Sequence, residues 1–60
     1  IPLAGVIYKT MWDYFEKTNQ MPPSPLIWKK YASCPPEVLE ATNEQINESL
    51  SFLIRAGFLK

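Results

Sequence analysis

The chain has 60 residues, with six basic and six acidic side chains and therefore no formal net charge. A chain of this length forms one small domain with a thin core. A neutral chain also lacks the basic surplus of domains that bind nucleic acid mainly through bulk charge. It contains no histidine and a single cysteine, Cys34. This composition excludes an internal disulfide, a zinc site of Cys and His ligands, and a His-dependent catalytic dyad or triad within the chain.

Neither a membrane span nor a secretory signal is recognisable in the sequence. No apolar run approaches the ~20 residues that cross a bilayer, and the first residues have no basic leader. We therefore expect an intracellular protein, cytoplasmic or nuclear, that does not bind membranes. Because the sequence begins without Met and stops within an apolar pattern at Leu59 and Lys60, we also expect residues 1–60 to be a single-domain fragment of a larger protein.

Residues 3–18 have the period of an amphipathic helix. Charged side chains lie on one side at 100° per residue, opposite an apolar side. The apolar side contains Leu3, Val6, Ile7, Met11, Tyr14 and Phe15. The prolines at 22 and 23 cannot continue this helix, because each lacks an N–H and favours extended backbone before it.

A short second helix is predicted from Pro25 to about Ala32. Ser24 is a favourable N-cap residue, and proline is favourable at the first helical position that follows. The next prolines, at 35 and 36, end this segment.

Residues 36–56 are the clearest helical segment, with Val38, Ile46, Leu50 and Leu53 among the residues of one apolar face. Leu50 and Leu53 lie at the centre of this face, so we expect both in the core. Gly57 is suited to a left-handed C-terminal cap, in which Phe58 folds back onto Leu53. Thr42-x-x-Gln45 matches a capping box, which would divide the segment into a short helix at 36–40 and a longer one from 43. Because the apolar face continues through residue 42, we favour one helix, straight or kinked. The sequence thus predicts a compact all-α domain of three helices.

The acidic residues of the third segment predict no catalysis but suggest a binding surface. Glu37, Glu40, Glu44 and Glu48 follow one another at spacings of three, four and four, which places them within about 80° of arc on one helix. A solvent-facing row of carboxylates does not converge on a cleft, as acid–base chemistry requires. We therefore expect no enzyme, no catalytic residues, no metal and no cofactor. The row is either a solvated face or a docking ridge for a basic partner, with Glu40, Glu44 and Glu48 as contacts.

Aromatic residues form a second candidate surface on the first helix. Tyr8 and Trp12 are four residues apart on the edge of the apolar face, next to Phe15. They widen this face beyond the needs of a three-helix core, so we expect Tyr8, Trp12 and Phe15 to contact a partner protein. The other interpretation is that Trp12 closes the core.

The only basic–aromatic cluster consists of Trp28, Lys29, Lys30 and Tyr31. Such residues can stack on a base and hold a phosphate, or they can form a protein hot spot. The alternative is that both aromatic rings pack into the core. With two lysines, we expect weak nucleic-acid binding by the isolated domain.

The last fifteen residues resemble the end of the winged-helix branch of helix-turn-helix domains. The matching positions are Ile46, Leu50, Leu53, Gly57, Phe58 and Leu59. The resemblance implies a three-helix core with a truncated wing, in a parent protein of replication, transcription or a similar nucleic-acid process. The sequence departs from the pattern in two ways. Residues 33–36 replace the expected short turn, and glutamates stand where DNA-reading helices carry Arg, Lys, Asn or Gln.

We therefore predict a non-enzymatic docking or oligomerisation module that binds another protein or a second copy of itself. The alternative is a DNA- or RNA-binding domain of helix-turn-helix type.

Overall fold

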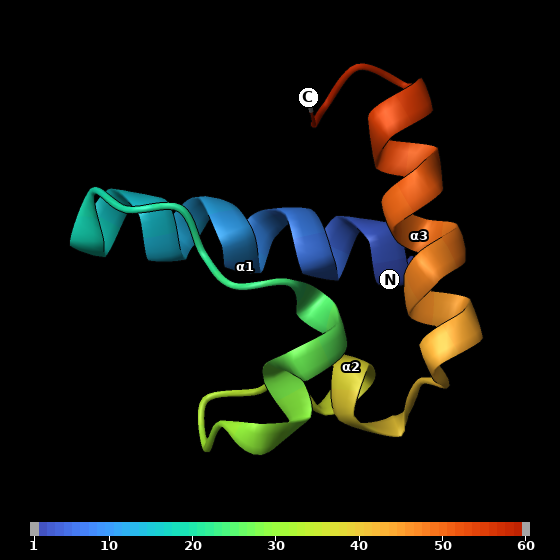
Figure 1. Ribbon diagram of the computed structural model, residues 1–60, viewed down its shortest axis with the longest axis horizontal. Helices are drawn as coiled ribbons and strands as arrows, with labels where there is room; N and C mark the ends of the chain where they lie inside the picture. Colours follow the sequence, from blue (N-terminus) through green and yellow to red (C-terminus); the bar gives the residue numbers. More distant parts are fainter. Residues whose placement is uncertain (1, 60) are drawn as a thin grey trace.

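The computed structural model describes residues 2–59 (Figure 1). These residues form four helical segments, joined by turns and loops, and contain no strand. Helix α1 spans Leu3–Thr18, the 3-10 helix η1 spans Pro25–Lys30, and helices α2 and α3 span Pro36–Glu40 and Asn43–Arg55. The Cα radius of gyration is 10.8 Å, close to the ~10 Å expected for a compact chain of this length. The predicted compact all-α fold is confirmed.

Helix α1 begins and ends where the sequence predicts. Pro2 is its N-cap, and Asn19 ends it in the left-handed region, with φ 56° and its N–H donating to the carbonyl of Phe15. Asparagine tolerates this conformation better than most residues do. Of the predicted apolar side, Ile7 is fully buried, whereas Tyr14 and Phe15 at the far end of the helix are exposed.

The second segment differs from the prediction in type and length. Ser24 caps it as expected, because its Oγ accepts from the N–H of Leu26. The winding is 3-10 and ends at Lys30, so the expected helix to Ala32 is too long. Tyr31 is extended, and the indole N–H of Trp28 donates to the carbonyl of Pro23 at 2.9 Å. This bond fixes the proline-rich segment against η1.

The favoured single helix over residues 36–56 is wrong, and the capping box is the reason. Ala41 and Thr42 are extended, with ψ 151° and 160°. The Gln45 N–H donates to Thr42 Oγ1 at 3.1 Å, while the Thr42 N–H donates to Gln45 Oε1 at 2.9 Å. These bonds satisfy donors that the first turn of a helix leaves without partners. The turn between α2 and α3 lets Val38 and Ile46 enter the same core.

The predicted left-handed C-terminal cap of α3 forms at Gly57, and the Phe58 ring, which was expected on Leu53, lies beside Tyr8. Gly57 has φ 86°. Its N–H donates to the carbonyl of Ile54 at 3.1 Å, and that of Phe58 donates to Leu53 at 2.9 Å. This is the Schellman pattern. It turns residues 57–59 back toward α1 (Figure 1).

Each helical segment, together with the turn between α2 and α3, contributes to one small hydrophobic core. Its buried residues are Ile7, Trp28, Val38, Ala41, Ile46 and Leu53. Leu50, expected in the core, is only partly buried and packs at its edge. Among residues 2–59, no helix combines the length and hydropathy of a membrane span.

Candidate functional site

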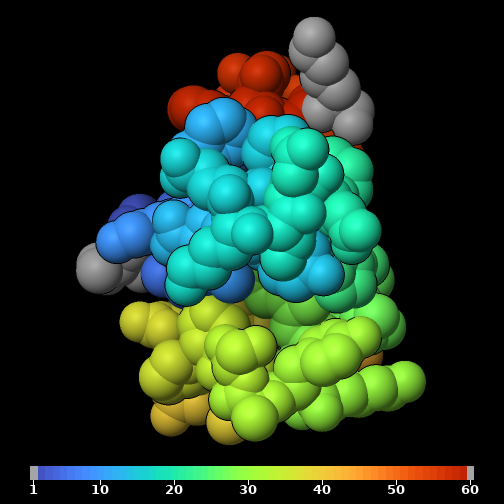
Figure 2. Space-filling model, turned by 90° about the vertical axis from the view of Figure 1, so that its left-hand side faces the viewer, coloured from blue at the N-terminus to red at the C-terminus, as the bar shows by residue number. Residues whose placement is uncertain are grey.

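An apolar groove lies between the second half of α1 and the chain that follows α3. We call it the aromatic groove. Its volume is about 390 Å³. Its walls include Tyr8, Trp12 and Phe15 of α1, Met21 of the following loop, and Ile54 and Phe58 at the other end of the chain. Figure 2 shows the C-terminal segment (red) against residues of α1 (blue to cyan).

The side chains of this groove are unusually exposed for their size and chemistry. Trp12, Ile54 and Phe58 each keep more than half of their surface accessible, and Met21 keeps 77%. Phe15 is also exposed. Contact with water is unfavourable for apolar side chains, so these exposed side chains are not stabilised by burial within the domain.

Local structure explains why the groove forms here. Tyr8, Trp12 and Phe15 are separated by four and three residues, which places them on one stripe of α1. The ring centroids of Trp12 and Phe15 are 6.0 Å apart. The Schellman turn returns Phe58 to α1, where its ring centroid lies 5.2 Å from that of Tyr8. Both distances are typical of favourable aromatic pairs, so these contacts help to hold the groove walls in place.

The predicted aromatic residues therefore come together, and the structure adds Met21, Ile54 and Phe58 to them. The sequence predicts a cap contact with Leu53 for Phe58, and it indicates no role in a binding surface for Met21 or Ile54. The signal that could have found Phe58 is the Gly57 cap, because a left-handed turn reverses the chain over the preceding helix.

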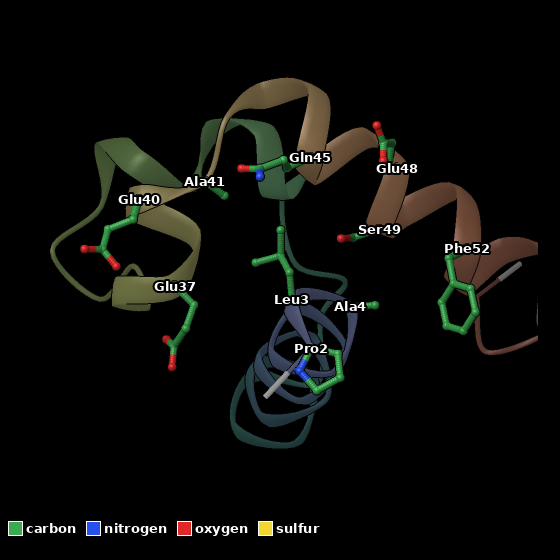
Figure 3. A pocket seen from close by; sticks show the side chains of 10 residues that line it. All are labelled: Pro2, Leu3, Ala4, Glu37, Glu40, Ala41, Gln45, Glu48, Ser49 and Phe52. Carbon is green, nitrogen blue, oxygen red and sulfur yellow. The ribbon is translucent and has the colours of Figure 1, made fainter.

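The four glutamates do not form the continuous ridge that the sequence predicts. The turn at Ala41 and Thr42 separates Glu37 and Glu40, on α2, from Glu44 and Glu48, on α3. Figure 3 shows Glu37, Glu40 and Glu48 around an open depression, with Leu3 at its centre.

Glu44 lies in a different hollow of the surface, together with Glu48 and Arg55. No glutamate lines the aromatic groove. The predicted partner residues Glu40, Glu44 and Glu48 thus stand apart from Tyr8, Trp12 and Phe15.

The basic–aromatic cluster is divided between core and surface. Trp28 is 5% exposed and hydrogen-bonded to Pro23, so its ring cannot stack on a base. The Lys29 ammonium donates to the carbonyl of Ala41 at 2.6 Å, which ties η1 to the turn before α3. Lys30 and Tyr31 are exposed. Only part of the predicted nucleic-acid surface is therefore accessible.

Within residues 2–59, no three His, Cys, Asp or Glu side chains are grouped so that they could hold a metal ion. The Cys34 thiol is partly buried and lies 3.5 Å from the carbonyl oxygen of Pro35. It is a turn residue in a small hollow beside Tyr14 and Tyr31.

Comparisons with protein-family models, curated proteins and solved structures found no match, so the winged-helix resemblance of residues 45–59 stays a prediction.

Proposed function

We propose that this chain is a non-enzymatic protein docking and oligomerisation module, and that the aromatic groove is its binding surface. The observation that carries the proposal is the contrast between a core of six buried side chains and a groove that exposes Trp12, Phe15, Met21, Ile54 and Phe58 together. Monomeric domains rarely leave a contiguous apolar patch of more than a few hundred Å² in water.

The size and composition of the groove support this function. With 150–250 Å² for each large side chain, the fractional exposures give about 500 Å² of accessible apolar surface. Tryptophan, phenylalanine and methionine are enriched in protein interfaces, and tryptophan is prominent among hot-spot residues. Among residues 2–59, the groove walls carry one phenol, that of Tyr8, and no side-chain carboxylate. Burial of apolar surface is therefore the interaction that they can offer.

The accessible basic groups give less support to nucleic-acid binding. Trp28 is in the core, and the exposed Lys29 donates its ammonium to the carbonyl of Ala41. Lys30 and Tyr31 are the other exposed residues of the cluster. As part of the proposal, the winged-helix resemblance supports a parent protein of replication, transcription or a similar process. In that setting the domain would serve protein contacts, as some winged-helix domains do.

A peptide selection tests the docking function without a known partner. Peptides from a random display library are selected on the chain and then measured against a Trp12→Ser variant. We expect selected peptides to have apolar residues at helical spacing and to lose about 30-fold in affinity for Trp12→Ser, because a central tryptophan contributes about 2 kcal/mol or more.

Tyr31→Ser is the matched control, since it removes a similarly exposed aromatic ring, 49% accessible, that is not part of the groove. Its affinity for the peptides should not change. The proposal fails if no peptide is enriched, or if the enriched peptides bind Trp12→Ser as well as the original chain.

A further inference from the structure

The face of α1 that contains Trp12 has a symmetric arrangement of residues about it, in which Tyr8 is half-buried beside Phe58 and the other residues are exposed. Lys9 is three residues before Trp12 and Glu16 is four residues after it, and both lie on the same side of Trp12 on the helix surface. Tyr8 and Phe15, four before and three after, flank Trp12 on the other side. The face thus has a charged edge and an aromatic edge, each centred on the same tryptophan.

We infer that the partner of the aromatic groove is a second copy of this chain, bound with the two α1 helices antiparallel and crossing at Trp12. This inference rests on the proposed docking function. A two-fold axis at the crossing superimposes positions at equal distances before and after the centre. Lys9 of one copy then lies opposite Glu16 of the second copy, offset along the helix by only about 1.5 Å. Tyr8 lies opposite Phe15 in the same way.

Charge complementarity favours a second copy over an unrelated partner. Each dimer gains two Lys9–Glu16 pairs of opposite sign, whereas a partner without this spacing would leave the charged edge unmatched. The formal net charge of zero means that two copies approach without overall repulsion. Complementary charges at the edge of an interface fix its register more than its affinity.

The total accessible surface is larger than that expected for a monomer of this mass. The accessible surface is 4547 Å², whereas a monomeric protein of 6.9 kDa is expected to expose about 4,000 Å². A stable interface buries about 800 Å² on each partner. The groove side chains supply more than half of this area, and the stems of Lys9 and Glu16 extend it along the charged edge.

Charge-reversal variants test the pairing directly, by sedimentation of the 60-residue chain from about 5 to about 500 μM. We expect the original chain to show a monomer–dimer equilibrium. Lys9→Glu alone and Glu16→Lys alone each place like charges opposite one another twice per dimer, so each should weaken the dimer by about tenfold or more.

Mixing the two single variants is the decisive step. In a heterodimer of Lys9→Glu with Glu16→Lys, both facing pairs have opposite signs again, so the mixture should associate more tightly than either variant alone. An effect of the substitutions within one chain cannot produce this rescue. Equal association of the mixture and of the separate variants would overturn the inference.

Two further results separate this inference from the docking function. Trp12→Ser should abolish the dimer and Tyr31→Ser should leave it intact. If the original chain stays monomeric up to the highest concentration while selected peptides bind the groove, the second copy is the wrong partner but the docking function stands. If the chain stays monomeric and no peptide binds, both fail.

Discussion

The two tryptophans divide the molecule into two regions with opposite roles. Trp28 belongs to η1 and to the hydrophobic core, is 5% exposed, and has its indole N–H bonded to the carbonyl of Pro23. Trp12 lies in the aromatic groove and is 53% exposed. Both are large apolar side chains on helical segments, so amino-acid type alone does not decide which of them is in the core.

The difference comes from what the neighbouring backbone provides. Around Trp28, proline turns and the extended residues Ala41 and Thr42 wrap the chain on itself and supply a carbonyl for the indole. The second half of α1 extends past the other helices (Figure 1). The segments that line the groove with Trp12 are the loop after α1, the end of α3 and the C-terminal turn. The same chemistry therefore stabilises the fold in one region and remains available for binding in the other.

Removal of the buried ring should have the largest effect. We expect Trp28→Ala to lower the free energy of unfolding by about 3–5 kcal/mol, and the Pro23 carbonyl loses its donor as well. A domain this small has little stability to lose, so the variant should be largely unfolded. Circular dichroism and urea titration measure this loss. A folded variant with an unchanged urea midpoint would show that Trp28 does not belong to the core.

Leu53→Ala is expected to cost about 2–5 kcal/mol, because Leu53 is 3% exposed at the centre of the core. Leu50 provides the matched comparison on the same helix. As Leu50 is only partly buried, Leu50→Ala should cost less than Leu53→Ala. Thermal unfolding of both variants shows which substitution lowers stability more. A larger loss of stability for Leu50→Ala would contradict the placement of α3.

The turn that separates α2 from α3 gives a smaller effect. Thr42→Ala removes the capping hydroxyl and should cost about 1 kcal/mol, while Thr42→Ser retains the oxygen and should cost less. Urea midpoints measure both losses. Equal stability of Thr42→Ala and the original chain would mean that the capping box does not hold this turn.

Much of this fold can be predicted from local sequence patterns, namely helix periodicity and capping residues. The period of α1, the Ser24 cap and the Gly57 cap all depend on residues close together in the chain, and all three form as predicted. The break after α2 also depends on residues close together in the chain, the capping-box pair Thr42 and Gln45. The continuous apolar face through residue 42 favours a single helix instead. Periodicity alone does not reveal that two helices separated by a turn can both pack their apolar residues into one core.

The groove could be predicted only in part for a similar reason. Tyr8, Trp12 and Phe15 share a helix stripe, which the sequence shows directly. Their neighbour Phe58 comes from a distant part of the chain, and Met21 comes from the loop that follows α1. Their positions depend on how the loop and the C-terminal turn pack against α1. The sequence did not decide between a buried and an exposed Trp28 for the same reason, because its burial depends on how the chain packs around η1.

The measurement that tests the division between the two regions most directly is the urea unfolding of Trp12→Ser, at a concentration low enough for the chain to be monomeric. If the aromatic groove serves binding, the variant should retain its helical content and lose less than about 1 kcal/mol of unfolding free energy, as expected for an exposed side chain. A loss of about 3 kcal/mol or more, comparable with that of a buried tryptophan, would contradict this account. It would show that Trp12 belongs to the core and not to a docking surface.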